Sequence, residues 1–178
     1  MGECASRPWQ AEVMVERTQQ DRELDTFWSL ASRRLRLPGV PTYTGVNPLG
    51  LLRPPSWAFG STPEQADRLL ALVLDGTKTA TASAHSDYLS AGEPLPEAGD
   101  LGIVLDGAGH PRALVQTTHV RVIPFEDVDE DHAHAEGEGD RSLRYWRLAH
   151  EHYFEAHAAG GYRPDMPVVL ERLRVVYP

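Results

Sequence analysis

Lysine is almost absent from this chain of 178 residues. Of its 17 basic residues, one is Lys78 and all the others are arginine. Lysine is normally among the commonest residues of a soluble protein, so a single copy stands out. An arginine keeps its proton near neutral pH, whereas a lysine removed from water can lose it. Lys78 is therefore a candidate for chemistry that arginine cannot perform, and the alternative is an ordinary exposed lysine.

Cysteine and long apolar runs are also scarce. The single cysteine, Cys4, cannot form an internal disulfide, which fits a reducing cytoplasm. No apolar run approaches the roughly 20 residues needed to cross a bilayer. Met1–Trp9 lacks the basic segment and apolar core of a signal peptide. We therefore expect a cytoplasmic protein without a membrane partner.

Acidic residues outnumber basic ones, 26 to 17, so the net charge is -9 at pH 7. Nonspecific binding of nucleic acid depends mainly on Lys and Arg neutralising phosphates. An acidic protein is poorly suited to hold a long backbone by bulk electrostatics. Any nucleic-acid ligand should therefore be small or gripped by a local pocket. The composition does not predict the oligomeric state.

Acidic residues and histidines crowd the segment 127–140. The segment contains, in order, Asp129, Asp131, His132, His134, Glu136 and Glu138. This run contains glycine and lacks the ligand spacing of a zinc site. We predict a solvated loop with a few residues turned inward, no metal and no cofactor.

The chain begins with a helical pattern that then disappears. Apolar residues recur at three- and four-residue spacing from Ala11 to about Leu37, which predicts helices that end at Pro38-Gly39. The stretch 40–55 is rich in Pro and Gly, as is typical of a linker or strap. We assign residues 1–55 to an N-terminal helical extension with a linker, and residues 56–178 to the main domain.

The main domain alternates helices with short strands. Thr62-Pro63-Glu64-Gln65 is a helix start, with a Thr cap, Pro at the first position and Gln at the capping-box position. Gly76 ends that helix. Strands are predicted near 78–83, 101–105, 112–123 and 168–176, and a last helix at 142–159.

These elements predict the fold class. Several short antiparallel strands with few helices favour an α+β fold over a parallel sheet. We expect a small mixed or antiparallel β-barrel flanked by helices. Strict alternation along the strand 112–123 places Val115 and Ile123 on one face.

Gly76-x-Lys78-x-x-Thr81 resembles the signature of ASCH domains, a family structurally similar to PUA RNA-binding barrels. The family pattern continues with an arginine, where this chain has Ser83. Further matches follow in order: Trp57-Ala58-Phe59-Gly60, Pro124-Phe125, Glu136-Gly137-Glu138-Gly139-Asp140 and Trp146-Arg147-x-x-His150. Together they resemble the longer bacterial branch of the family, from Ser56 to Tyr177.

The resemblance implies a PUA-like barrel with a cleft that holds Lys78 and Thr81. It also implies RNA or a nucleotide or nucleoside as the ligand. One group of the family hydrolyses the acetyl amide of N4-acetylcytidine with a lysine, a threonine and a glutamate. Another group, closer to the longer branch, is associated with cleavage of single-stranded RNA.

The candidate catalytic residues are Lys78, Thr81 and Glu136. For amide hydrolysis Thr81 would be the nucleophile, and Lys78 its base if burial lowers the lysine pKa. Glu136 would orient Lys78 or protonate the leaving amine, and Glu138 competes with it for that role. Positions 78 and 81 face opposite sides of an ideal strand, so the hypothesis needs a turn or bulge between them.

For RNA cleavage Lys78 would stabilise the phosphorane or protonate the leaving oxygen, with Tyr88 or a histidine as partner. The candidate ligand-binding residues are Trp57, Phe59, Thr79, Ser83, Tyr88 and Glu138. The aromatic residues would stack on an unpaired base, although most aromatic residues of such a domain belong to the core.

Two plainer interpretations remain open. In the first, the protein is a non-catalytic module for RNA or nucleotides, and Lys78 only contacts phosphate. In the second, the hydroxyl residues around Thr81 belong to an ordinary strand and bond to backbone.

Overall fold

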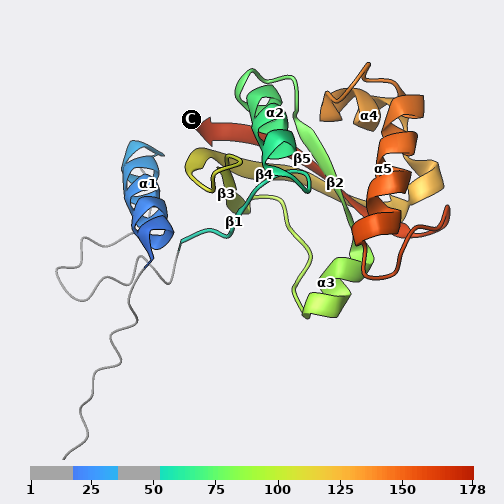
Figure 1. Cartoon of the computed structure of the whole chain (residues 1–178), viewed down its shortest axis with the longest axis horizontal. Helices are drawn as coiled ribbons and strands as arrows, with labels where there is room; N and C mark the ends of the chain where they lie inside the picture. The colour runs from blue at the N-terminus through green and yellow to red at the C-terminus, as the bar shows by residue number, and fades with distance from the viewer. Residues whose placement is uncertain (1–17, 36–52) are drawn as a thin grey trace, which may run out of the picture.

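The computed structural model describes residues 18–35 and 53–178, and predictions for the other residues, Cys4 and most of the linker among them, lie outside those ranges. The described residues form five α-helices, one 3-10 helix (Phe125–Asp127) and five strands (Figure 1). The helices are α1 (Gln19–Leu35), α2 (Pro63–Leu74), α3 (His85–Ala91), α4 (Glu130–Glu136) and α5 (Leu143–His157). The strands are β1 (Ser56–Trp57), β2 (Ala80–Ala84), β3 (Leu101–Leu105), β4 (Pro111–Pro124) and β5 (Pro167–Tyr177).

The strands form one sheet in the order β1-β3-β4-β5-β2. β1 runs parallel to β3, and all other neighbours in the sheet are antiparallel. The predicted α+β class with flanking helices is confirmed. The sheet is open, however, and is not the closed barrel of the prediction. Its edge strands β1 and β2 do not pair with each other, and β1 has only two residues with which to form a ladder.

The sequence correctly predicts α2, the helix that precedes Lys78. Thr62 caps it by accepting a hydrogen bond from the backbone N–H of Gln65 at 3.3 Å. Pro63 occupies the first helical position, where no intrahelical N–H bond is needed. Gly76 follows the helix with φ +81°, a left-handed conformation that glycine adopts without strain.

Strand β4 does not alternate strictly along its length. Its pairing register with β5 shifts between Thr117 and His119. Before the shift, Val115 packs in the apolar cluster beneath α2, and after it, Ile123 packs against the cluster formed with α5. The prediction of a common face for Val115 and Ile123 is wrong, because an extra residue in a strand reverses the direction of all later side chains.

Apolar clusters join each helical layer to the sheet. α1 contributes Leu24, Trp28 and Ala31 to a cluster with β3 and β4. α2 packs through Leu70 and Val73 on residues of β3, β4 and β5. On β5, Leu173 lies in the α2 cluster and Leu170 in the cluster of α4 and α5. Because these two positions face opposite sides of a strand, α2 covers one side of β5, and α4 and α5 cover the other.

Two helices were not predicted. The segment expected to be an acidic loop contains α4, capped by Asp129, whose side chain accepts from the backbone N–H of His132 at 2.8 Å. α3 follows β2 directly and is too short to give a clear apolar period. In the described ranges, no helix has the length and hydropathy that a bilayer span requires.

Candidate functional site

Lys78 lies in the turn that joins α2 to β2. Its backbone N–H donates to the carbonyl of Leu72 at 2.8 Å, and the next N–H, that of Thr79, donates to the carbonyl of Ala135 at 2.7 Å. β2 begins at Ala80, so strand alternation does not set the direction of Lys78 relative to Thr81. The side chain of Lys78 is 1% exposed, which excludes an ordinary surface lysine.

Two carboxylates hold the Lys78 ammonium. Nζ donates to Glu136 Oε2 at 2.8 Å and to Glu138 Oε1 at 2.7 Å. Glu136 is fully buried, whereas the side chain of Glu138 is 24% exposed. The sequence could not choose between the two carboxylates, and the structure brings both to Lys78.

Gly137 allows this double contact, because it ends α4 between the two glutamates. Its φ is +73°, and an added Cβ would lie 2.6 Å from the carbonyl oxygen of Thr77. A side chain at this position is therefore excluded by both the backbone conformation and the neighbouring turn.

Glu136 is the centre of a buried hydrogen-bonding group. Its Oε1 accepts from the indole Nε1 of Trp146 at 2.7 Å and lies 3.1 Å from His132 Nε2. His150 Nε2 lies 3.5 Å from the same oxygen, and the His150 ring stacks on Trp146 with centroids 4.2 Å apart. Partners thus surround both oxygens, as a buried charge requires. We name this group the Lys78 cluster; its members are Lys78, His132, Glu136, Glu138, Trp146 and His150.

The carboxylates keep Lys78 charged. Burial alone lowers the pKa of a lysine, but the charges and hydrogen bonds of Glu136 and Glu138 outweigh burial and raise the pKa of Lys78 above its ordinary value. Burial raises the pKa of Glu136, but the charge of Lys78, with smaller contributions from His150 and His132, brings that pKa far below its ordinary value. Lys78 therefore does not meet the condition of a lowered pKa that a role as base requires.

Thr81 lies among a second group of polar side chains. It pairs with Glu171 of β5 across the antiparallel ladder, so the two side chains are neighbours on one face. Glu171 Oε2 accepts a hydrogen bond from Thr117 Oγ1 at 2.8 Å. Ser83 Oγ lies 3.0 Å from the Tyr88 hydroxyl. We name these five residues, Thr81, Ser83, Tyr88, Thr117 and Glu171, the Glu171 cluster.

Phe59 lies near Lys78 of the first cluster and packs beside the strand residues of the second. The Lys78 Nζ lies 5.4 Å from the centroid of its ring. Phe59 also packs with Leu173, which faces the same side of β5 as Glu171. Both clusters therefore border the apolar cluster beneath α2.

No hydrogen bond recorded for the described residues joins Lys78 to Thr81, so of the three candidate catalytic residues the structure brings only Lys78 and Glu136 into contact.

The other predicted ligand-binding residues have structural contacts. Phe59 is 7% exposed, so its ring face is not open to a base. Trp57 is half-buried and lies edge-on to Phe59, with centroids 6.3 Å apart. The hydroxyl of Thr79 donates to the carbonyl of Ala135 at 3.3 Å. Thr79 thus behaves as the plainer interpretation of these hydroxyl residues expects.

Sequence reasoning missed His132 and Glu171 as partners in these groups. His132 precedes Glu136 by four residues, a spacing that brings the two side chains together only once the segment is recognised as a helix. Glu171, together with the adjacent Arg172, interrupts the apolar residues of β5 between Leu170 and Leu173. That interruption was the available signal.

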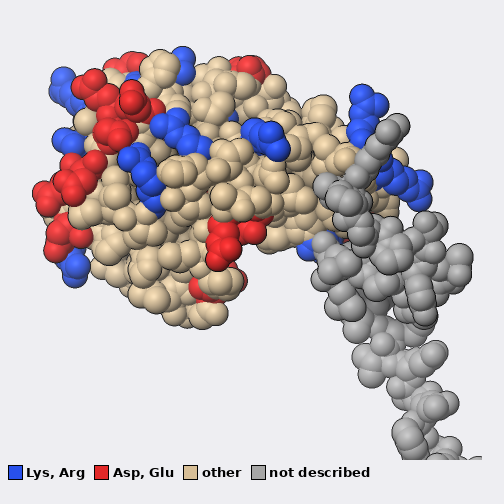
Figure 2. Space-filling view, turned by 180° about the vertical axis from the view of Figure 1, so that it is seen from behind, with Lys and Arg blue, Asp and Glu red and all other residues tan. Residues whose placement is uncertain are grey.

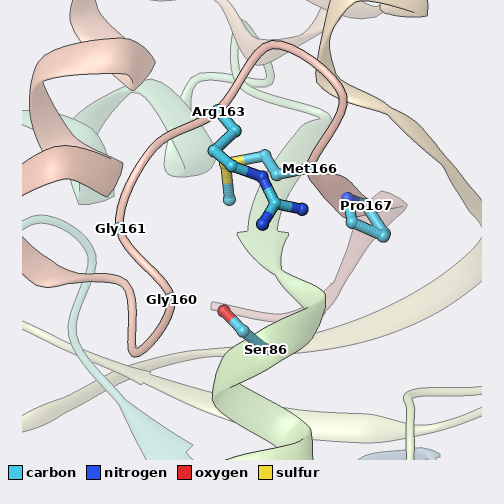
Figure 3. A pocket seen from close by; sticks show the side chains of 6 residues that line it. All are labelled: Ser86, Gly160, Gly161, Arg163, Met166 and Pro167. Atoms are coloured by element: carbon cyan, nitrogen blue, oxygen red, sulfur yellow. The ribbon is translucent and has the colours of Figure 1, made fainter.

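The described part of the molecule includes two hollows of different size. The larger, about 280 Å³, lies at the end of α2; Lys78 and Thr79 line one side, and Leu173 and Arg174 of β5 another. The smaller, about 130 Å³, lies between α3 and the loop before β5, where Ser86 and Arg163 border it from opposite sides (Figure 3). Ligand pockets commonly enclose about 300–1,000 Å³, and of these two hollows the one beside Lys78 is nearer to that size.

These features define a small α+β domain with a buried, doubly paired lysine at one end of its sheet. A family model for the ASCH domain matches residues 55–177. The chain therefore belongs to the ASCH domain family, which has a PUA-like fold.

Known structures agree with this assignment. The crystal structure of protein EF3133 from Enterococcus faecalis V583 is similar, with a TM-score of 0.75 and 32% identity over 88% of this chain and 89% of that one. The crystal structure of an ASCH domain from Lactobacillus crispatus JV V101 has a TM-score of 0.70 and 27% identity, over 93% and 99% of the two chains. A search of curated proteins found no significant match.

Proposed function

We propose that this protein binds an RNA- or nucleotide-type ligand where Glu138 reaches the surface beside Lys78. The observation that supports this proposal is a buried, charged lysine with one partially exposed carboxylate partner, in a chain of the ASCH family. The charges of Lys78, Glu136 and Glu138 sum to one net negative charge. Such a group suits the neutral hydrogen-bonding atoms of a base or sugar better than a phosphate.

The surface charge favours a short ligand over a long one. Acidic residues, with arginines among them, lie at the end of the molecule that carries α4 and α5 (Figure 2). The exposed acidic residues of this part of the chain include Glu126, Asp127, Glu130 and Asp131. Repulsion from this end opposes a long phosphate backbone. A single nucleotide or a short single strand brings few phosphates and is the better match.

Hydrolysis of the ligand is a second candidate function, favoured by the 2.7 Å contact between Lys78 and Glu138. A lysine that stays charged can stabilise negative charge that develops on a phosphate in the transition state. Deacetylation of an N4-acetylcytidine-type substrate would first require Lys78 to lose its proton, which its raised pKa opposes. Of the two reactions, cleavage of single-stranded RNA therefore has the better support.

The test measures binding and turnover separately. Titration with the four nucleoside monophosphates and with short single-stranded RNA gives affinities, and incubation with labelled RNA and with N4-acetylcytidine gives turnover. We expect Glu138→Gln to weaken binding about tenfold, a loss of about 1.4 kcal/mol. Glu151→Gln, on the exposed side of α5, is the matched control and should bind as the wild type does.

Lys78→Arg separates a binding module from an enzyme. A module that uses only the positive charge should keep most of its binding, whereas an enzyme that needs a proton from the lysine should lose turnover. Arginine is larger than the buried lysine, so thermal unfolding of Lys78→Arg shows whether a loss of turnover accompanies a loss of folding. Absence of binding to every RNA and nucleotide tested would refute the proposal.

A further inference from the structure

The loop between α4 and α5 carries Glu138 and is held in one conformation. Arg141 has φ +63°, in the left-handed region that a residue with a Cβ adopts rarely. Its Nε donates to the carbonyl of His134 at 3.1 Å, and its Nη2 donates to Nδ1 of the same residue at 3.2 Å. These bonds tie the loop back onto α4. Backbone strain that the surroundings maintain in this way is found mostly at ligand-binding and catalytic sites.

Gly139, the residue after Glu138, lies against the ring of Tyr145. A Cβ added to Gly139 would lie 2.5 Å from Cε1, 2.5 Å from Cζ and 2.6 Å from Cε2 of that ring. A point at nearly equal distances from three atoms of a planar hexagon lies close to the perpendicular through the centre of the ring. Gly139 therefore covers one face of the Tyr145 ring, and a side chain at position 139 would collide with it.

The opposite face of the Tyr145 ring is open to a ligand. Tyr145 is 42% exposed, whereas the next residue, Trp146, is 2% exposed. With one face against Gly139, the exposure of Tyr145 comes from the other face and the edges of its ring. Among the described residues, no aromatic ring and no cation is recorded against Tyr145. A ring that is already fixed from behind loses little conformational entropy when a ligand covers it.

We propose that an unpaired base of the ligand stacks on Tyr145, while Glu138 accepts a hydrogen bond from the base or sugar of the same nucleoside. The two side chains border one stretch of surface, because Glu138 precedes Gly139 and neighbouring Cα atoms are about 3.8 Å apart. The inference rests on the proposed function, and it adds the residue that binds the base. Stacking of this kind needs an open ring face rather than a hollow.

A stacking platform also defines the class of ligand. Every base has a π face, so a single ring discriminates only weakly among the four bases. A base inside a duplex already has its faces covered by its neighbours, so the ligand must present an unpaired base. A mononucleotide or a single strand meets this condition, and double-stranded RNA does not.

Substitutions at position 145 test the ring itself. Tyr145→Phe keeps the ring and should bind adenosine monophosphate and short single-stranded RNA within about twofold of the wild type. Tyr145→Ala and Tyr145→Leu remove the ring and should bind about tenfold more weakly, a loss of about 1.4 kcal/mol. Tyr153→Ala is the matched control, because Tyr153 is 39% exposed and lies on the same helix, about 12 Å further along its axis. It should bind as the wild type does.

The outcomes separate this inference from the proposed function. Failure of the wild type to bind any RNA or nucleotide refutes both. Equal binding by the wild type and Tyr145→Ala, or a Tyr145→Phe variant that loses as much as Tyr145→Ala, refutes the inference alone. Ribose 5-phosphate has no base, so its displacing adenosine monophosphate at equal concentration would also overturn the inference. Thermal unfolding of each variant shows whether a loss of binding accompanies a loss of folding.

Discussion

Glu136 and Glu171 are both carboxyl groups removed from water, yet their pKa values move in opposite directions. Burial raises the pKa of each. Lys78 reverses that effect at Glu136, whose oxygens also contact His132 and Trp146. Glu171 has one neutral donor, Thr117, and no cation recorded against it in the described residues. The difference shows that partners, rather than burial alone, set the direction in which the pKa of a carboxyl group moves.

The two clusters also differ in what they connect. The Lys78 cluster joins the turn before β2 to α4 and α5, with both oxygens of Glu136 occupied. The Glu171 cluster lies mostly on strands that the sheet already holds in place, and among the described residues Glu171 accepts one side-chain hydrogen bond, from Thr117. A pair of carboxyl groups whose environments separate their pKa values often marks a functional site. We therefore expect the buried members of the Lys78 cluster to contribute mainly to stability and the Glu171 cluster to contribute less to it.

The largest effect should come from removing the cation. Lys78→Met leaves the buried charge of Glu136 without its ammonium, and breaking a buried pair from one side costs about 3–5 kcal/mol. Urea unfolding of this variant, of Glu136→Gln and of the double variant measures the coupling between the two residues. We expect the double variant to lose much less than the sum of the single losses. Additive losses would show that the pair contributes no specific coupling.

A change of pH should act on the two carboxyl groups with opposite sign. Glu136 has a lowered pKa in the folded state, so its stabilisation is complete above the ordinary value of 4.5 and is lost as the pH falls through the folded value. Glu171 has a raised pKa, so its contribution is present below 4.5 and is lost as the pH rises through the folded value.

This contrast is measured by unfolding at about pH 7 and about pH 4. Glu136→Gln should be less stable than the wild type at both values. Glu171→Gln should equal or exceed the wild type at the higher pH and lose that advantage at the lower one. If Glu136→Gln and Glu171→Gln both lowered the free energy of unfolding at about pH 7, the environments assigned to the two carboxyl groups would be wrong.

Gly137→Ala should have a smaller but definite effect on the Lys78 cluster. A residue with a Cβ in the left-handed region costs about 1–2 kcal/mol, and the Cβ would also press on the carbonyl of Thr77. We expect a loss of about 2 kcal/mol or more in the free energy of unfolding, with weaker ligand binding as Glu138 moves from Lys78. Gly92→Ala is the matched control, because its φ is also positive and its Cβ would meet no atom within 4 Å.

The sequence predicts much of the scaffold that holds these clusters. The Thr62 cap, the Pro63 start and Gly76 define α2 through local rules, and the lone Lys78 draws attention to the turn that follows. Local rules suffice here because each signal lies within a few residues of the structure it determines.

The features that the sequence did not predict depend on contacts between distant segments. Thr81 and Glu171 are brought together by the pairing of β2 with β5, although 90 positions of chain separate them. The bulge after Thr117 reverses the direction of the side chains in the second half of β4. The state of Lys78 was also missed, since its pKa depends on two carboxylates that only the end of α4 brings together. No local pattern contains that information.

The smallest effect expected is that of Tyr88→Phe, and it tests whether the Glu171 cluster is built for stability. Burial raises the pKa of Tyr88, so its hydroxyl is neutral and the variant removes one neutral hydrogen bond to Ser83. Such a bond contributes about 0.5–1.5 kcal/mol, which urea unfolding of Tyr88→Phe, Ser83→Ala and the double variant can measure. A cluster that serves ligand binding should lose little stability here but bind nucleoside monophosphates more weakly. A stability loss as large as that of Lys78→Met, with affinity unchanged, would mean that both clusters are structural and that the contrast between Glu136 and Glu171 has no bearing on ligand binding.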